Sequence, residues 1–149
     1  MMDLDASYFA AFYRGLHGAD RSPFPWQERL ARRACSGDWP RVIALPTASG
    51  KTACIDIALF ALACQFDREG RTAPRRIFFV VDRRVIVDQA FEHARKIASR
   101  LETADGPLLH EVAGRLRALA RSDRALDCFQ LRGGIYRDDA WAGPRSSPP

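Results

Sequence analysis

Residues 45–52 read Leu45-Pro46-Thr47-Ala48-Ser49-Gly50-Lys51-Thr52, between an apolar run at 42–45 and an apolar-rich segment at 53–66. The run before them is typical of a β-strand, and the segment after them is typical of a helix. A tight turn that opens into a helix leaves backbone N–H groups unpaired at one point, and that point attracts an anion. Lys51 can then reach the β- and γ-phosphates of a nucleotide, and the Thr52 hydroxyl can bind Mg²⁺. The segment is therefore predicted to be a phosphate-binding loop.

This loop departs from the simple P-loop pattern, because Leu45 stands six residues before the lysine, where that pattern has glycine. It fits a variant better. The segment resembles the Pro-Thr-(Gly)-Ser-Gly-Lys-Thr form of the first motor lobe of superfamily 2 helicases, with Ala48 in place of the usual glycine. The resemblance implies a catalytic role for Lys51 and contacts to ATP from the whole loop, namely Thr47, Ala48, Ser49, Gly50, Lys51 and Thr52. A chance Gly-Lys-Thr on a loop is the alternative.

Composition restricts the class of protein. The chain has 149 residues, enough for one domain or part of one. A net charge of +5 and a pI near 9.4 permit a polyanionic partner without proving one. There is no apolar run long enough to cross a membrane and no secretory signal pattern at the N-terminus. Four cysteines without Cys-x-x-Cys spacing indicate reduced thiols, so the sequence predicts a cytoplasmic protein with no membrane partner.

Two helices are predicted before the loop. Aromatic residues at three- and four-residue spacings indicate an amphipathic helix over residues 5–16. Ser22 and the prolines after it mark the start of a second helix, and Gly37 is its expected end.

Gln27 lies in this second helix, 24 residues before Lys51 (51 − 27 = 24), and it follows aromatic residues and prolines. A glutamine amide carries both a donor and an acceptor, which suits the N6 and N7 edge of adenine. In superfamily 2 helicases a glutamine at about this distance, preceded by an aromatic residue, reads the adenine. The resemblance implies that role for Gln27, with Phe24 as the stacking ring. A solvated surface glutamine is the alternative.

The remaining pattern predicts an α/β fold. Residues 77–81 are β-branched or aromatic without alternation, which is typical of a strand buried on both faces of a parallel sheet. Helices are expected at 84–101 and 108–119, and a further strand at 125–131. We therefore expect a P-loop NTPase (RecA-like) lobe, apparently truncated, with a parallel sheet and helices on both faces. The expected divisions are an N-terminal amphipathic helix at 1–22, a partial first lobe at 23–137 and a disordered tail at 138–149.

Asp82, at the end of the predicted strand, has two interpretations. It resembles a Walker B carboxylate that holds Mg²⁺, as in small nucleotide kinases, but Arg83 and not a second carboxylate follows it. The favoured interpretation aligns residues 82–89 with a helicase segment that grips the nucleic-acid backbone, and Arg84 then falls on the arginine of that segment. Two arginines at a helix N-terminus suit phosphate contacts that are independent of base sequence. Solvated arginines are the third possibility.

Four blocks occur in the order seen in one family, and they cover residues 23–142. They are Pro23-Phe24-Pro25-Trp26-Gln27, the loop at 45–52, the segment at 80–89 and the segment at 131–142 that contains Leu131-Arg132-Gly133-Gly134. Together they resemble the CRISPR-associated helicase-nuclease of type I interference systems, with the type I-U (I-G) branch as one candidate. The resemblance implies an ATP- and Mg²⁺-dependent translocase that moves along single-stranded DNA and is recruited to a surveillance complex. It implies DNA backbone contacts for Arg83, Arg84, Gly133 and Gly134.

The departures from this family limit the expected activity. The family's Asp-Glu segment, its second lobe with an arginine finger and its histidine-aspartate nuclease motif have no counterpart here, and His17, His93 and His110 are isolated in the sequence. We therefore expect a helicase fragment that is inactive as an ATP hydrolase on its own. The other hypotheses are a nucleotide kinase that uses Asp82 for Mg²⁺ and a non-catalytic relic that only binds nucleotide or nucleic acid.

Overall fold

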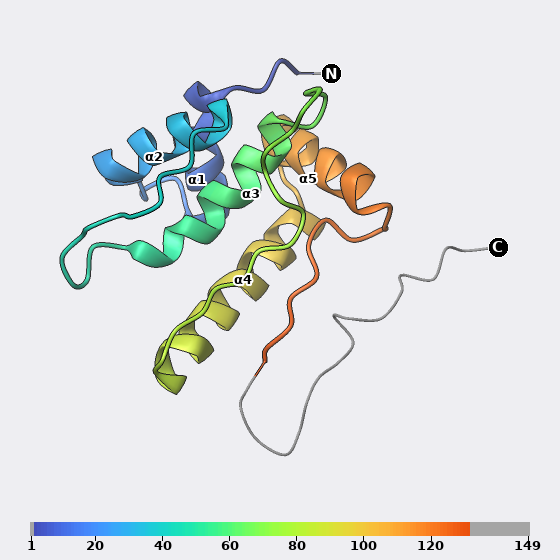
Figure 1. Cartoon of the computed structure of the whole chain (residues 1–149). Helices are drawn as coiled ribbons and strands as arrows, with labels where there is room; N and C mark the ends of the chain where they lie inside the picture. The colour runs from blue at the N-terminus through green and yellow to red at the C-terminus, as the bar shows by residue number, and fades with distance from the viewer. Residues whose placement is uncertain (1, 132–149) are drawn as a thin grey trace.

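Helix α3 (Cys54–Cys64) lies at the centre of the structure, a computed structural model that describes residues 2–131 (Figure 1). Eight of its residues are buried, as expected for a helix that is apolar on almost every side. It packs against α1, α2 and α5. The other elements, in chain order, are the 3-10 turn η1 (Ala6–Tyr8), α1 (Phe9–His17), α2 (Pro25–Ser36), the 3-10 turn η2 (Lys51–Ala53), α4 (Arg84–Glu102) and α5 (Pro107–Ala120).

The predicted helices are confirmed, and local signals explain their ends. Pro25 occupies the first turn of α2, where its missing N–H costs nothing. Gly37 ends that helix in the left-handed region at φ 92°, as its sequence position predicted. Helix α4 begins at Arg84 and ends at Glu102, one residue beyond the predicted range.

The predicted α/β fold is wrong. Residues 2–131 form five α-helices and contain no β-strand, so the expected RecA-like parallel sheet with helices on both faces is not there. The three segments expected to form its strands, 42–45, 76–81 and 125–131, run as coil (Figure 1). Val42 is 81% exposed and Val80 is 86% exposed, so these positions lie outside the core. Helices α1, α2 and α5 cover α3 in place of a sheet.

The core is organised by aromatic rings on α1 and α3. The Phe60 ring centroid lies 5.6 Å from that of Phe9 and 5.0 Å from that of Phe12, and all three side chains are buried. Such ring pairs add about 0.5–1.5 kcal/mol each beyond their burial. Helix α1, from the predicted N-terminal division at 1–22, therefore shares one hydrophobic core with α3.

A buried glutamine fixes the loop that follows α3. Gln65 donates from Nε2 to the carbonyl of Ala34 at 2.8 Å, and its Oε1 accepts the amides of Thr72 and Ala73, both at 3.0 Å. Every polar atom of this 1% exposed side chain thus has a partner, which removes the cost of burying it. The contacts join α2, α3 and the loop at residues 72–73, which leads to the 76–81 segment.

Within the part of the chain that the structure describes, no helix is both long and apolar enough to cross a membrane.

Candidate functional site

The predicted phosphate-binding loop leads directly into η2 and α3, as the sequence indicated. Ala48 has φ 59° and Gly50 has φ 74°, both in the left-handed region. That conformation costs a residue with a Cβ roughly 1–2 kcal/mol, so glycine would be the less strained residue at the position of Ala48. The Ser49 hydroxyl donates to the carbonyl of Pro46 at 2.7 Å and closes the turn.

Two side chains of α2 hold this loop through hydrogen bonds to its backbone carbonyls. The indole Nε1 of Trp26 donates to the carbonyl of Ser49 at 2.9 Å, and Nε2 of Gln27 donates to the carbonyl of Gly50 at 3.0 Å. Gln27 Oε1 accepts the amide of Phe24 at 2.8 Å and caps the start of α2. The structure therefore brings Gln27 and the loop together, as predicted, but it shows the amide bound to the backbone and 1% exposed.

Gly50 fits this arrangement for a second reason. A Cβ at that position would lie 2.9 Å from Gln27 Nε2 and 3.1 Å from the Phe24 ring. The Phe24 ring is 51% exposed and stands beside the loop, where a flat ligand has access to it. Phe24, Gln27 and the loop thus form one site at the start of α3.

Lys51 and Thr52 are the first residues of η2, so they occupy the N-terminal turn that leads into α3. The Lys51 side chain is exposed and that of Thr52 is half-buried. Burial and the nearby charge of Asp56 raise the pKa of the Cys54 thiol, which keeps this neighbour of the loop in its neutral form. Lys51 presents its side chain to solvent where the loop enters η2.

The predicted nucleic-acid residues lie at the start of α4. Arg83 is the N-cap of that helix and Arg84 is its first residue, and both are exposed, as is Asp82. Among residues 2–131, no hydrogen bond or ion pair joins these three side chains to the predicted phosphate-binding loop. Gly133 and Gly134 lie outside the described residues.

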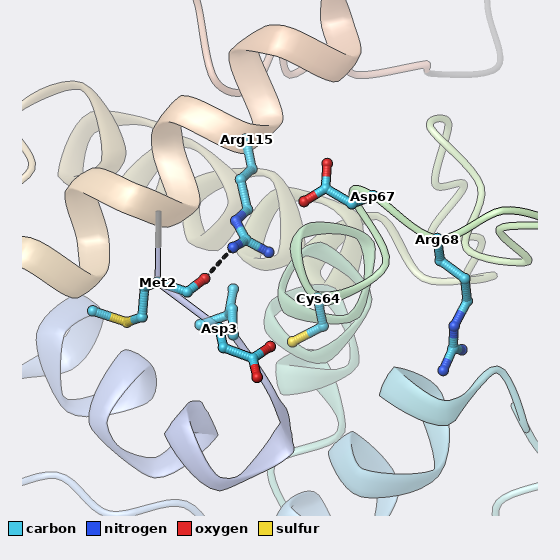
Figure 2. A pocket seen from close by; sticks show the side chains of 7 residues that line it. Met2, Asp3, Cys64, Asp67, Arg68 and Arg115 are labelled. Atoms are coloured by element: carbon cyan, nitrogen blue, oxygen red, sulfur yellow. Dashed lines mark hydrogen bonds between the residues drawn. The ribbon is translucent and has the colours of Figure 1, made fainter.

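A separate hollow of about 260 Å³ lies at the opposite end of α3 (Figure 2). Its lining includes Asp3, Asp67 and Arg68 together with Arg115, whose guanidinium donates to the carbonyls of Met2 and Ala63. The 11 residues of α3 separate this hollow from the loop by roughly 16 Å. It is therefore not part of the predicted nucleotide site.

A cluster that sequence reasoning missed joins three helices beside the loop. His17 Nε2 lies 2.5 Å from Asp56 Oδ1, and His93 Nε2 lies 2.6 Å from Asp56 Oδ2. The two imidazole rings stack, with centroids 5.2 Å apart and an interplanar angle of 19°. His17 and His93, which are isolated in the sequence, are therefore neighbours in the folded chain. The one available signal was a lone aspartate, Asp56, in an otherwise apolar helix.

The histidines determine the charge state of Asp56, which is fully buried. Burial acts to raise the pKa of its carboxyl, but the hydrogen bonds with His17 and His93, together with their charges, outweigh that effect. The pKa of Asp56 therefore lies below its ordinary value, and the carboxylate stays ionised. An ionised carboxylate facing two imidazole nitrogens has the atoms needed to hold a metal ion.

The four cysteines are all free, as their sequence spacing predicted.

Comparison with known proteins adds no family to these observations. No family model, no curated protein and no solved structure matches this chain.

Proposed function

We propose that this chain is the ATP-binding part of a superfamily 2 DNA helicase or translocase that acts in CRISPR interference in the cytoplasm. The observation that carries the proposal is the pair of hydrogen bonds from Trp26 and Gln27 to the loop carbonyls of Ser49 and Gly50. They join the two sequence motifs that an adenine nucleotide would have to contact together. The proposal does not include a RecA-like sheet.

The direction of these carbonyls supports an anion site on the loop. In a trans peptide the C=O and the N–H of one plane point in opposite directions. Because the carbonyls of Ser49 and Gly50 point toward α2, the N–H groups of Gly50 and Lys51 point away from it. Amides directed outward at a helix start attract phosphate, and Lys51 adds a full positive charge there. Thr52 is then the proposed ligand for the Mg²⁺ that accompanies ATP.

The adenine end of the proposed site lies at Phe24. Its ring is half exposed beside Gly50, and an exposed aromatic face suits a stacked base. Gln27 acts as a positioning residue, since both ends of its amide contact the backbone and its side chain is 1% exposed.

The proposed activity of this chain alone is binding. Hydrolysis at a helicase-like rate also requires a carboxylate that orients water and an arginine finger, which contributes about 10³–10⁵ in rate. The partners of the complete protein, by resemblance, are single-stranded DNA and a CRISPR surveillance complex.

ATP binding is tested by titrating a fluorescent ATP analogue with Mg²⁺ into the protein and into two lysine variants. Lys51→Ala removes a charge-assisted contact worth about 1.5–3 kcal/mol, so the affinity falls by about 10- to 100-fold. Lys96→Ala is the matched control, because Lys96 is the chain's other lysine and lies exposed on α4. Equal affinities for the two variants would contradict the proposed phosphate site.

DNA binding is tested with a labelled single-stranded oligonucleotide over a range of salt concentrations. The double variant Arg83→Ala/Arg84→Ala should weaken binding for all base sequences and reduce the salt slope by about 1 for each lost phosphate contact. Arg29 and Arg32, exposed on α2, provide the control pair of substitutions. An unchanged salt slope in the Arg83/Arg84 variant would show that α4 does not contact the DNA backbone.

A further inference from the structure

The side chains of His17, Asp56 and His93 converge from three helices, and the proposed ATP site uses none of them. His17 is the last residue of α1, Asp56 lies in the first turn of α3 and His93 lies near the middle of α4. Both imidazoles present Nε2 to the carboxylate, and the three ligand atoms all lie within 4.8 Å of one another. Three potential ligands thus face one point in the molecule.

We propose that these three residues bind one divalent transition-metal ion of the Zn²⁺ type. Two imidazole nitrogens and one carboxylate oxygen form a ligand set that Zn²⁺ accepts, with water or another group in the fourth position. Ligand atoms bound tetrahedrally to one Zn²⁺ at about 2.1 Å lie about 3.4 Å apart. Each Nε2 now lies 2.5 or 2.6 Å from its carboxylate oxygen, so an ion would replace these hydrogen bonds with shifts of about 1 Å, and the most distant ligand atoms would approach by at most about 1.4 Å.

The ligand chemistry separates this site from the Mg²⁺ proposed at Thr52. Mg²⁺ is a hard cation that takes oxygen ligands and retains several waters, whereas imidazole nitrogen favours Zn²⁺ and its neighbours in the transition series. A nucleotide would bring Mg²⁺ to the loop. The histidine cluster is expected to bind its metal without nucleotide, so this inference does not rest on the proposed function.

Burial and charge favour a cation at this point. Asp56 is fully buried, and the ion pairs recorded for it among residues 2–131 are with the two histidines. A buried carboxylate requires a compensating positive charge, which a divalent ion supplies while both imidazoles stay neutral. The side chains of His17 and His93 are 10% and 22% exposed, so the His93 side offers the wider path for water to a fourth coordination position.

A metal at this site would have a structural effect. His17 and His93 are 76 residues apart in the chain (93 − 17 = 76), and one ion would fix both of their helices to the start of α3. A link that closes a long loop restricts the unfolded chain more than a local contact does. Metal binding is therefore expected to raise the thermal stability of the whole protein.

The proposal is tested on the full chain after dialysis against a chelator, by titrating Zn²⁺ alone and measuring bound metal and thermal unfolding. The variants are His17→Gln and His93→Gln. Glutamine can still donate a hydrogen bond to Asp56 but is a poor metal ligand. His110→Gln is the control, since His110 is the third and last histidine and is exposed on α5. Circular dichroism in chelator verifies that each variant is folded.

The expected result is one Zn²⁺ per chain for the unmodified protein and for His110→Gln, with a rise in thermal stability on metal binding. Each cluster variant should lose at least about tenfold in affinity and lose that rise. Titration with Co²⁺ identifies the ligands, because a thiolate-to-cobalt absorption band would mean that cysteines bind the metal. The proposal is overturned by that band, by no binding at micromolar Zn²⁺ or by equal losses in His110→Gln. In each of these cases the cluster is a hydrogen-bond network only.

Discussion

Helix α3 and the segment at 76–81 are both apolar almost without interruption, yet the helix is buried and much of the segment is exposed. In α3, Ile57 and Phe60 are 0% exposed, whereas in the second segment Phe78 is 61% and Val80 is 86% exposed. Apolar content alone therefore does not decide which segment is buried. The difference lies in what the backbone of each segment requires.

A helix satisfies its own backbone, because each N–H bonds to a carbonyl four residues earlier. It can be buried wherever side chains pack, and α1, α2 and α5 supply that packing around α3. An extended segment has no such internal bonds and needs a neighbouring strand before its backbone can be buried without cost. Residues 2–131 contain no β-strand to provide that neighbour, and the Val80 side chain remains exposed.

The largest effect in this comparison is expected from Phe60→Ala. The substitution removes the ring that packs against Phe9 and Phe12 and leaves a cavity beside α1. The free energy of unfolding should fall by about 3–5 kcal/mol, measured by urea denaturation. Phe129→Ala is the matched change in an extended segment, where the ring is 43% exposed, and it should cost about 1 kcal/mol or less. Similar losses for the two variants would show that the Phe129 ring belongs to the core.

A smaller effect, specific to the loop, is expected from Gly50→Ala. The new Cβ would meet Gln27 Nε2 at 2.9 Å while the backbone is at φ 74°, so stability should fall by about 2 kcal/mol and ATP affinity with it. Gly114→Ala is the control, because Gly114 lies in α5 and a Cβ added there would meet open space. That control should gain about 0.5–1 kcal/mol. A neutral Gly50→Ala would mean that Gln27 does not hold the loop.

The sequence predicted the helices well because their signals are local. Pro25 and Gly37 mark the limits of α2 through their own backbone preferences, and the structure agrees. The prediction of strands was wrong because a strand forms only next to a partner strand, and the partner is not encoded in the local sequence. The run at 77–81 is compatible with a strand, but only a partner strand would make it one, and periodicity carries no information on partners.

The two candidate sites also differ in how far the sequence could predict them. The loop and Gln27 could be paired in advance because their spacing in the sequence matches a known pattern, and the structure places them in contact. The histidine cluster could not, because His17 and His93 lie 39 and 37 residues from Asp56. Only the packing of α1, α3 and α4 brings them together. Asp56 itself was the detectable anomaly, since a buried charge requires a partner.

The smallest expected effect is the sharpest test of the comparison. Val80→Asp places a charge at a position that is 86% exposed, so the free energy of unfolding should change by no more than about 0.5 kcal/mol. In the parallel sheet that the sequence predicted, the same residue would be buried on its own face, and a carboxylate there would prevent folding. Val112→Asp is the matched control, because Val112 is 0% exposed in α5 and its replacement should unfold the chain. Circular dichroism and urea denaturation measure the helix content and the free energy of unfolding of both variants. If Val80→Asp is as damaging as Val112→Asp, the segment at 76–81 is buried in solution and the all-helical arrangement is incomplete.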